Sequence, residues 1–220
     1  FPKDKIVLTG NPVRQQLLET QLTKAEALRT FGLEPSKKTI LIVGGSLGAR
    51  TINDSVMAHL DELQNSGVQV IWQTGKNYFE NIKQQLAEKS PMPALKPTDF
   101  IADMGAAYRA ADLVISRAGA SSISEFCLIG KPVILVPSPN VAEDHQTKNA
   151  MALVNRQAAQ FVSDAEAPQK LIPLALSTVK NDQILGQLSH NIKLMALRNS
   201  AETIANEVFA LAEKQANKKR

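Results

Sequence analysis

The segment Thr39-Ile-Leu-Ile-Val-Gly-Gly-Ser-Leu-Gly-Ala-Arg50 decides the fold that we expect for this chain. Its first five residues form a short apolar run rich in β-branched side chains, which predicts a buried strand. Gly44–Arg50 follow directly and lead into an amphipathic stretch, which predicts a tight turn and then a helix. A strand, a glycine-rich turn and a helix in this order are typical of a βα unit and of a parallel sheet.

The same alternation continues along the chain, so we predict the α/β class with a Rossmann-like, doubly wound parallel sheet of about six strands. The expected strands are Thr39–Val43, Val68–Trp72, Ala94–Lys96, Leu113–Ile115, Val133–Val136 and Gln160–Val162. The expected helices are about Ala49–Gln64, Tyr78–Glu88, Met104–Ala110, Ser121–Ile129, Gln146–Arg156 and Pro168–Val179.

The two ends of the chain differ from this middle part. Residues 1–14 contain a turn at Gly10-Asn11-Pro12 and are interpreted as a linker segment, which leaves residues 15–220 as one predicted domain. A last helix is predicted at about Ala201–Lys214. Its apolar face is formed by Ile204, Val208, Leu211 and Ala212. We expect this face to pack on the sheet or on a neighbouring domain.

Composition excludes several classes of protein. Hydrophobic residues are 44% and charged residues 21% of the chain, as in a globular fold, and no apolar run approaches the ~20 residues of a membrane helix. The single cysteine, Cys127, excludes an intramolecular disulfide and fits a reducing compartment such as the cytoplasm. Although the net charge is +4, aromatic residues are few and no basic stripe accompanies them, so nucleic acid is not a predicted partner.

Gly44–Arg50 are the first candidate for a binding site. Glycines let a backbone approach a phosphate closely, and the amides at a helix start favour negative charge. Ser46 adds a hydroxyl donor. The segment lacks the lysine of a P-loop and the glycine spacing of a dinucleotide fingerprint. A tight turn without any ligand is the alternative interpretation.

Ser116-Arg117-Ala118-Gly119-Ala120-Ser121-Ser122 follow another predicted strand, with Glu125 one turn further along the helix. A carboxylate in this place can accept hydrogen bonds from two ribose hydroxyls. The structural alternative is that Ser121 or Ser122 caps the helix and Glu125 completes a capping box. Tyr108 is interpreted as a packing residue.

The third candidate is the polar segment Pro137–Ala150, in which His145, Gln146 and Asn149 cluster at a predicted helix start. Side-chain amides both donate and accept, as a hydroxyl-rich ligand requires. Taken alone, His145 is better interpreted as a surface or capping histidine. Because all three candidates follow strands, we expect them at one edge of the sheet, where doubly wound folds bind ligands.

Five blocks in this order resemble the MurG family of N-acetylglucosaminyltransferases. They are Gly10–Arg14, Gly44–Arg50, Phe100–Met104, Ser116–Glu125 and His145–Ala150. Members of this family often have Gln at the position of Leu47 and a Gln pair at the position of His145-Gln146. The resemblance spans nearly the whole chain, from about Val7 to about Leu211.

The resemblance implies the carboxyl-terminal, donor-binding half of a GT-B glycosyltransferase. The implied reaction is inverting transfer of N-acetylglucosamine from UDP-N-acetylglucosamine to a lipid-linked muramoylpentapeptide, which converts lipid I to lipid II. The acceptor and the general base would belong to an amino-terminal domain, so no catalytic residue is expected in this chain. No cofactor and no metal are expected, and the sequence has no Asp-x-Asp pair. The full-length protein would work in the cytoplasm, peripherally at the inner face of the cell membrane.

The resemblance also assigns a part of the donor to each matching residue. The uracil would contact the apolar side chain of Ile101 and the neighbouring backbone, and the ribose would contact Glu125. The diphosphate would contact Arg14, Ser46 and amides near Ala120 and Ser121, and the sugar would contact His145, Gln146 and Asn149. Two other functions share the same sequence features. One is a UDP-N-acetylglucosamine epimerase, and the other is a non-catalytic module that binds nucleotide sugars.

Overall fold

A computed structural model describes residues 2–13, 17, 20–139 and 144–218 of the chain. The strands are β1 (Thr39–Val43), β2 (Gln69–Gln73), β3 (Leu95–Thr98), β4 (Leu113–Ser116), β5 (Val133–Leu135) and β6 (Gln160–Phe161). The helices are η1 (Lys3–Lys5), α2 (Lys24–Thr30), α3 (Arg50–Ala58), α4 (Leu60–Asn65), α5 (Phe79–Ala87), α6 (Met104–Ala110), α7 (Ala120–Ile129), α8 (His145–Val154), α9 (Ala167–Val179), α10 (Asp182–Lys193) and α11 (Ser200–Lys218).

The six strands form one parallel sheet in the order β3-β2-β1-β4-β5-β6. All six predicted strands are present, with ends that differ by at most two residues from the prediction. Strand β1 lies at the centre, where Ile40 pairs with Val70 of β2 on one side and with Leu113 of β4 on the other. The chain therefore builds the sheet outward in one direction and then in the other, as a doubly wound fold requires.

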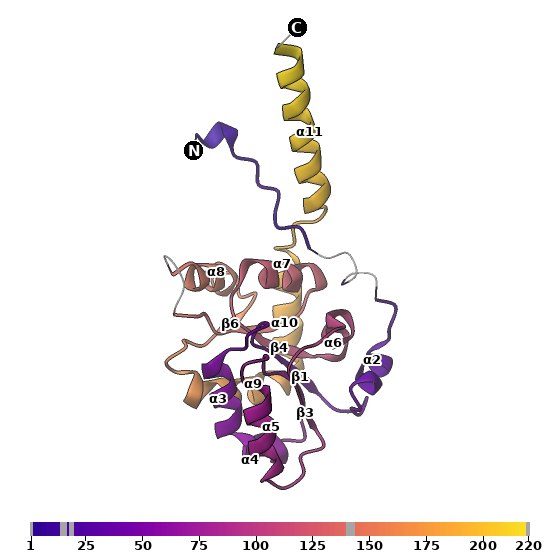
Figure 1. The fold of residues 1–220 in the computed structure, drawn as a ribbon, viewed down its shortest axis with the longest axis vertical. Helices are drawn as coiled ribbons and strands as arrows, with labels where there is room; N and C mark the ends of the chain where they lie inside the picture. The colour runs from indigo at the N-terminus through magenta and orange to yellow at the C-terminus, as the bar shows by residue number, and fades with distance from the viewer. Residues whose placement is uncertain (1, 14–16, 18–19, 140–143, 219–220) are drawn as a thin grey trace.

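Helices cover both faces of this sheet (Figure 1). Because side chains alternate along a strand, Ile40 and Ile42 face one core, which α3, α4, α5 and α9 complete, whereas Leu41 faces the other core. That second core is completed by α2, α6, α7 and α8. Burial on both faces explains why the inner strands β1, β4 and β5 are almost continuously apolar rather than alternating, whereas the edge strands β3 and β6 are only partly buried.

Helix α3 is fastened to β2 by a buried polar contact. The indole of Trp72 donates a hydrogen bond to Oδ1 of Asn53 at 3.0 Å, and Nδ2 of Asn53 donates to the carbonyl of Thr74 at 2.9 Å. Both side chains are buried, so each polar group is satisfied inside the protein. This contact fixes the start of α3 relative to the end of β2, which matters for the site described below.

Two helices differ from the prediction. The helix predicted over Ala49–Gln64 is divided at His59, whose backbone (φ −120°, ψ 27°) leaves the helical region between α3 and α4. Helix α10 was not predicted, although Asn181 caps it by accepting from the Ile184 amide and its buried residues have helical spacing. Those residues are Leu185, Leu188 and Ile192.

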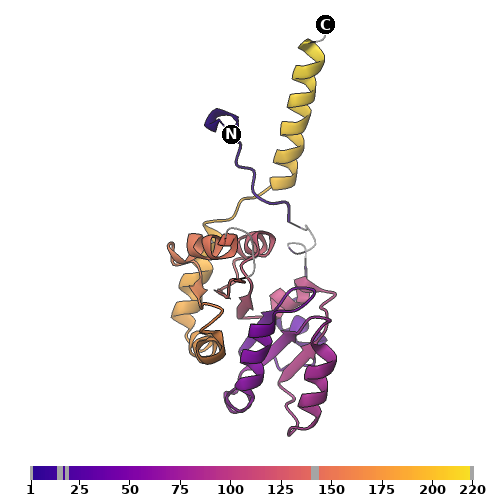
Figure 2. The ribbon, with the colours of Figure 1, turned by 60° about the vertical axis from the view of Figure 1, so that its left-hand side comes forward.

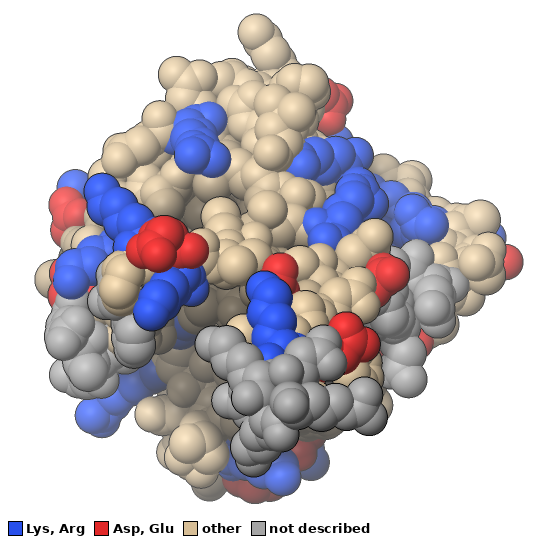
Figure 3. All heavy atoms as spheres, turned by 90° about the horizontal axis from the view of Figure 1, so that it is seen from above, with Lys and Arg blue, Asp and Glu red and all other residues tan. Residues whose placement is uncertain are grey.

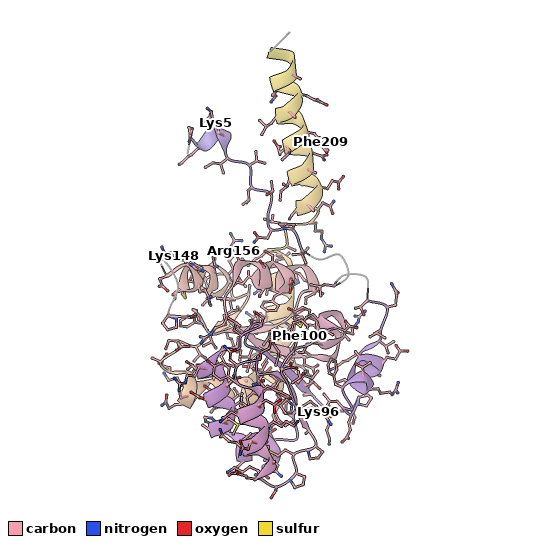
Figure 4. All side chains as sticks on the ribbon, in the orientation of Figure 1. Lys5, Lys96, Phe100, Lys148, Arg156 and Phe209 are labelled. Carbon is pink, nitrogen blue, oxygen red and sulfur yellow. The ribbon has the colours of Figure 1, made fainter. Side chains whose placement is uncertain are left out.

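Helix α11 stands away from the rest of the molecule, beside the chain segment that leads in from residue 2 (Figures 1 and 2). Phe209 is 67% exposed and lies far from the sheet (Figure 4), and Val208 and Leu211 are exposed as well. Seen from above, basic and acidic side chains are interspersed around the body rather than joined in one patch (Figure 3). None of the helices in the described part of the chain has the length and apolar content to span a bilayer.

Candidate functional site

The order of the strands places a crevice between β1 and β4. The direction in which strands are added to the sheet reverses at this point. β2 and β3 are added on one side of β1, and the chain then returns to add β4 on the other side. The loops that leave the carboxyl ends of the two strands therefore diverge, and ligands of doubly wound sheets bind in the gap between them. Gly44–Ala49 form the loop after β1, and Arg117–Gly119 form the loop after β4.

The loop after β1 packs against the loop after β2, backbone to backbone. A Cβ atom at Gly48, where φ is +87°, would come within 2.2 Å of the Thr74 carbonyl oxygen. A Cβ atom at Gly75 would come within 2.1 Å of the Gly48 nitrogen. Only glycine fits at these two positions, so the sequence Gly-Gly-Ser-Leu-Gly here holds the loop tightly before α3 begins.

Three helices begin at this edge without a side-chain cap, namely α3, α7 and α8. The N-cap residues are Ala49, Gly119 and Asp144, and none of their side chains accepts a hydrogen bond from the helix. The first amides of a helix have no partner within it, so they can bind an anion at this edge. The capping interpretation of Ser121 and Ser122 is wrong, because α7 begins one residue earlier, at Ala120.

Glu125 does not complete a capping box. Its Oε2 accepts a hydrogen bond of 2.8 Å from the hydroxyl of Tyr108 on α6. Tyr108 is 5% exposed and packs edge-on against Phe126, with 5.8 Å between ring centroids. It is therefore more than the packing residue that the sequence suggested, because it orients the carboxylate. Among the described residues, the second carboxylate oxygen of Glu125 has no hydrogen-bond partner, and Glu125 is half-buried.

Gln146 and Asn149 hold the loop after β4 in place. Oε1 of Gln146 accepts from the amides of Ala118 at 3.2 Å and Ser138 at 2.9 Å, and Nδ2 of Asn149 donates to the Ala118 carbonyl at 3.1 Å. Gln146 and Asn149 on α8, which the sequence predicts to bind a ligand, therefore join the loops after β4 and β5. Among the described residues, Nε2 of Gln146 has no hydrogen-bond acceptor, and Gln146 lines an open pocket of about 470 Å³.

An ion pair that the sequence analysis missed forms one wall of this pocket. The guanidinium of Arg117 pairs with Asp164 and also donates to the carbonyls of Val136 and Pro137, each at 3.1 Å. The second oxygen of Asp164 accepts from the hydroxyl of Thr51 at 2.8 Å. The pair therefore ties together loops that follow three strands, β4, β5 and β6. Its sequence signal was the position of each residue just beyond a strand.

The segment after β3 presents its backbone rather than the side chain of Ile101. That side chain is 5% exposed and belongs to the core, whereas the neighbouring Phe100 is 54% exposed (Figure 4). Gln73 connects this segment to the loop after β1, because its Nε2 donates to the carbonyls of Gly45 at 3.1 Å and Asp99 at 3.5 Å. Oε1 of Gln73 is buried without a partner in the described part of the chain.

The remaining predicted residues either lie at the same edge of the sheet or are not among the residues that the structure describes. Ser46, Ala120, Ser121 and His145 are exposed in the loop after β1 or at the starts of α7 and α8. Arg14 is outside the described residues. In the same sequence block, Nδ2 of Asn11 donates to Oγ of Ser124 at 3.0 Å, which fastens the linker segment to α7.

The family to which the chain belongs follows from comparison with known sequences. Residues 39–204 match the model of the glycosyltransferase family 28 C-terminal domain. The matched range covers all six strands and all the loops described above. The chain belongs to this family.

One curated relative agrees closely with the family model. A protein of Phocaeicola vulgatus is 62% identical over 97% of the chain and is named UDP-N-acetylglucosamine–N-acetylmuramyl-(pentapeptide) pyrophosphoryl-undecaprenol N-acetylglucosamine transferase. The chain covers 57% of that relative, so it spans little more than half the length of the protein that it matches.

Solved structures agree with the fold and with the family. The crystal structure of Acinetobacter baumannii MurG superposes with a TM-score of 0.74 at 28% identity, over 96% of this chain and 58% of that one. This confirms the resemblance to the MurG family and the Rossmann-like half of a GT-B fold. A UDP-GlcNAc 2-epimerase from Neisseria meningitidis superposes with a TM-score of 0.67 over 96% of this chain and 57% of that one. It is 14% identical and shares the fold alone.

Proposed function

We propose that this chain is the donor-binding half of an inverting transferase that moves N-acetylglucosamine from UDP-N-acetylglucosamine to a lipid-linked muramoylpentapeptide. The observation that carries the proposal is the crevice between β1 and β4, where two helices begin with free amides behind tight loops. The 62% identity to the Phocaeicola vulgatus protein, which is named as an N-acetylglucosamine transferase, supports this choice of donor and acceptor. The likeness to the epimerase, at 14% identity, supports only the fold.

The diphosphate of the donor would bind across the starts of α3 and α7. Cleavage of the bond between sugar and phosphate builds negative charge on the leaving UDP, and preorganised amides stabilise such charge as it develops. Amides of the loop after β1 and of Ala120 and Ser121 would supply these dipoles, and Ser46 and Arg14 would add a hydroxyl and a cation. This arrangement stabilises the leaving group with groups of the chain itself.

The other predicted residues would bind the remaining parts of the donor. The free oxygen of Glu125 would accept from the ribose hydroxyls, with Tyr108 holding the carboxylate in position. The uracil would contact the backbone at Ile101, with the exposed ring of Phe100 beside it. His145, Gln146 and Asn149 would address the sugar from the start of α8, and the free Nε2 of Gln146 is a donor for one hydroxyl.

The general base and the surface that binds the acceptor would belong to a domain outside this chain. Residues 1–14 would link that domain to the donor domain, which comprises residues 15–220. The domain outside the chain would dock on the exposed apolar face of α11. Exposure of Val208, Phe209 and Leu211 supports this, because apolar side chains gathered on one protruding helix gain stability when covered. The full-length protein would act in the cytoplasm, at the inner face of the membrane that carries its lipid acceptor.

Calorimetry with UDP tests the donor site on this chain. Glu125→Ala should weaken UDP binding by about 1–3 kcal/mol, the usual contribution of hydrogen bonds to a charged group. Tyr108→Phe is the matched control: it removes the orienting hydroxyl but keeps the carboxylate, so it should have a smaller effect. Equal affinity in wild type and folded Glu125→Ala would remove Glu125 from the site.

Product analysis of the full-length protein tests the reaction. With UDP-N-acetylglucosamine and a lipid-linked muramoylpentapeptide, we expect a disaccharide lipid and free UDP, whereas this chain alone should bind donor and transfer nothing. Conversion of UDP-N-acetylglucosamine without any acceptor would instead indicate epimerisation. Donor binding without transfer by the full-length protein would indicate a non-catalytic module.

A further inference from the structure

A second and larger pocket lies at the opposite edge of the sheet from the donor crevice. It is an open pocket with a volume of about 600 Å³, lined by α2, α6, the end of α7 and α10. Lys38, Asp112 and Pro132, which directly precede β1, β4 and β5, form its inner wall. At about 3.3 Å per residue, the five residues of β1 separate this pocket from the donor loops by roughly 17 Å. We call it the amino-edge pocket.

Among the described residues, basic side chains outnumber carboxylates in the amino-edge pocket. Five basic side chains line it, against the two carboxylates Asp112 and Asp182. The basic residues are Lys24, Lys38, Arg109, Lys131 and Lys193. Among the described residues, Asp112 pairs with Lys24 and Asp182 pairs with Lys38. Three cations therefore remain without a carboxylate partner among the side chains that the structure describes.

These three cations come from separate elements and converge on one space. Lys131 follows α7 and donates to the carbonyl of Ala111 at 2.5 Å, and Nε of Arg109 on α6 donates to the carbonyl of Leu22 at 2.8 Å. Lys193 ends α10 and lies along Gly130, where an added Cβ would come within 2.1 Å of its side chain. Glycine at position 130 thus lets the Lys193 side chain reach the pocket.

The helix ends that face this edge offset only part of the excess charge. A helix carboxyl end carries about half a negative charge, so the ends of α6 and α7, which lie just before β4 and β5, together contribute roughly −1 against the excess of three cations among the described residues. The cost is visible at Lys131: its pKa is lowered to about 8, first by burial and then by Lys24, Arg109 and Lys193, with Asp112 acting in the opposite direction. A bound anion would relieve this repulsion.

We propose that the amino-edge pocket is a second ligand site, separate from the donor crevice, which binds a phosphate or diphosphate group. A doubly charged anion matches the excess of cations, and lysines serve as point-charge partners of phosphate. The apolar side chains of Leu128, Ile129 and Leu185 also line the pocket and leave room for an uncharged body attached to the phosphate. The phosphate could belong to a free metabolite or to a lipid headgroup.

Calorimetry with inorganic pyrophosphate at low ionic strength tests this site. We expect binding that weakens as salt is added, and a loss of about tenfold in affinity for each of Lys131→Met and Lys193→Gln. Lys193→Gln alters an exposed side chain and keeps the test valid if Lys131→Met fails to fold. Lys180→Met removes an exposed lysine elsewhere and should leave the affinity within twofold of wild type, about the scatter expected for an uninvolved surface charge.

Amide NMR separates this site from the donor crevice, because each is lined by its own glycines. Pyrophosphate should shift the amide signals of Gly105, Gly130 and Gly186, which line the amino-edge pocket. Shifts confined to Gly44 and Gly48 would mean that the diphosphate site of the donor binds the probe, and would overturn the proposal without touching the proposed transferase. Affinity that is the same in all variants would overturn it as well.

Sedimentation with vesicles distinguishes the source of the phosphate. If the natural ligand is a lipid headgroup, phosphatidylglycerol vesicles should retain the wild-type chain and release Lys131→Met and Lys193→Gln, while phosphatidylcholine vesicles retain none of them. If it is a free metabolite, pyrophosphate should bind and the vesicles should not discriminate between the variants. Failure of both pyrophosphate and phosphatidylglycerol to bind would show that the cations serve only the helix ends.

Discussion

The helix starts beside the donor crevice differ from those of α2 and α10 at the amino edge. Helices α2 and α10 begin near the amino edge, since Lys24 and Asp182 at their starts pair with residues that directly precede β4 and β1. Both are capped by side chains, α2 through the capping box of Thr23 and Glu26 and α10 through Asn181. At the carboxyl edge, α6 is capped as well, because Asp103 accepts from the Ala106 amide, whereas α3 and α7 beside the crevice have no such cap.

This difference separates amides that serve folding from amides that are left for a ligand. A side-chain cap satisfies the first amides of a helix permanently, whereas the amides of an uncapped start bind water and stay available to an anion. The amino edge shows the opposite arrangement of charge: its anion attraction comes from side chains, because helix carboxyl ends repel anions. We therefore propose that phosphate is attracted by helix amides at the donor crevice and by cationic side chains at the amino edge. Mutations can alter the two kinds of group separately.

The largest effect should come from a methyl group added at the donor edge. Gly48→Ala places Cβ against the Thr74 carbonyl, so we expect a loss of about 3 kcal/mol or more in the free energy of unfolding. Gly67→Ala, before β2, is the matched control: its φ of +75° is similar, but nothing lies within 4 Å of the new Cβ. It should cost about 1 kcal/mol. Equal losses in urea denaturation would show that the close contact of the loops is unimportant.

The burial of Lys131 beside other cations at the amino edge should appear in the pH dependence of stability. The lowered pKa of Lys131, about 8, makes its charged form unfavourable in the folded state. Below pH 8 this penalty is fully present, and it disappears as pH rises from 8 towards the unfolded value of about 10.4. Relative to Lys131→Met, the wild type should gain about 2 kcal/mol of stability over that window, after allowance for partial exposure. A constant difference between the two proteins would contradict the assignment.

A cap introduced at the donor edge should compete with the ligand. Gly119 has φ −70° and ψ 141°, and an added Cβ would meet only Oγ of Ser122, at 3.9 Å, so aspartate fits there. Gly119→Asp should stabilise the chain by a few tenths of a kcal/mol, because aspartate is the better cap. It should weaken UDP binding by about tenfold or more, since its carboxylate occupies the α7 amides and repels phosphate.

Gly119→Ala is the matched control for the Gly119→Asp variant, because it adds a side chain without a cap. Calorimetry should give it nearly wild-type affinity for UDP. If both variants bind UDP as wild type does, the amides at the start of α7 do not contact the donor.

The smallest effect should come from a cap removed far from the donor. Asn181→Ala deletes the acceptor for the Ile184 amide, at 3.1 Å, and should cost about 1 kcal/mol of stability. UDP affinity should not change, because α10 begins at the amino edge. Weaker binding of UDP by this variant would mean that the two edges are coupled.

The inner strands were predictable because burial on both sheet faces demands continuous apolar runs of β-branched residues, as in Thr39–Val43, whereas the partly exposed edge strands β3 and β6 contain no such run. Helix α10 escaped prediction although Asn181 and the spacing of Leu185, Leu188 and Ile192 signalled it. The break at His59 had no comparable signal, since neither glycine nor proline divides α3 from α4. Tertiary packing decided that boundary.

The residues of the candidate site were predictable as a set, because positions just beyond parallel strands converge on one edge. Their individual contacts were less so. Arg117 and Asp164 lie 47 positions apart, and only the fold brings them together. The partner of Glu125, Tyr108, lies on a different helix, so the local capping pattern pointed to the wrong contact.

The position of the donor can be determined by a crystal structure of the chain with UDP. We expect the diphosphate between the loop after β1 and the first amides of α7, with the ribose at Glu125 and the uracil at the backbone of Ile101. UDP bound instead among Lys131, Arg109 and Lys193, with the crevice between β1 and β4 unaltered, would contradict this expectation.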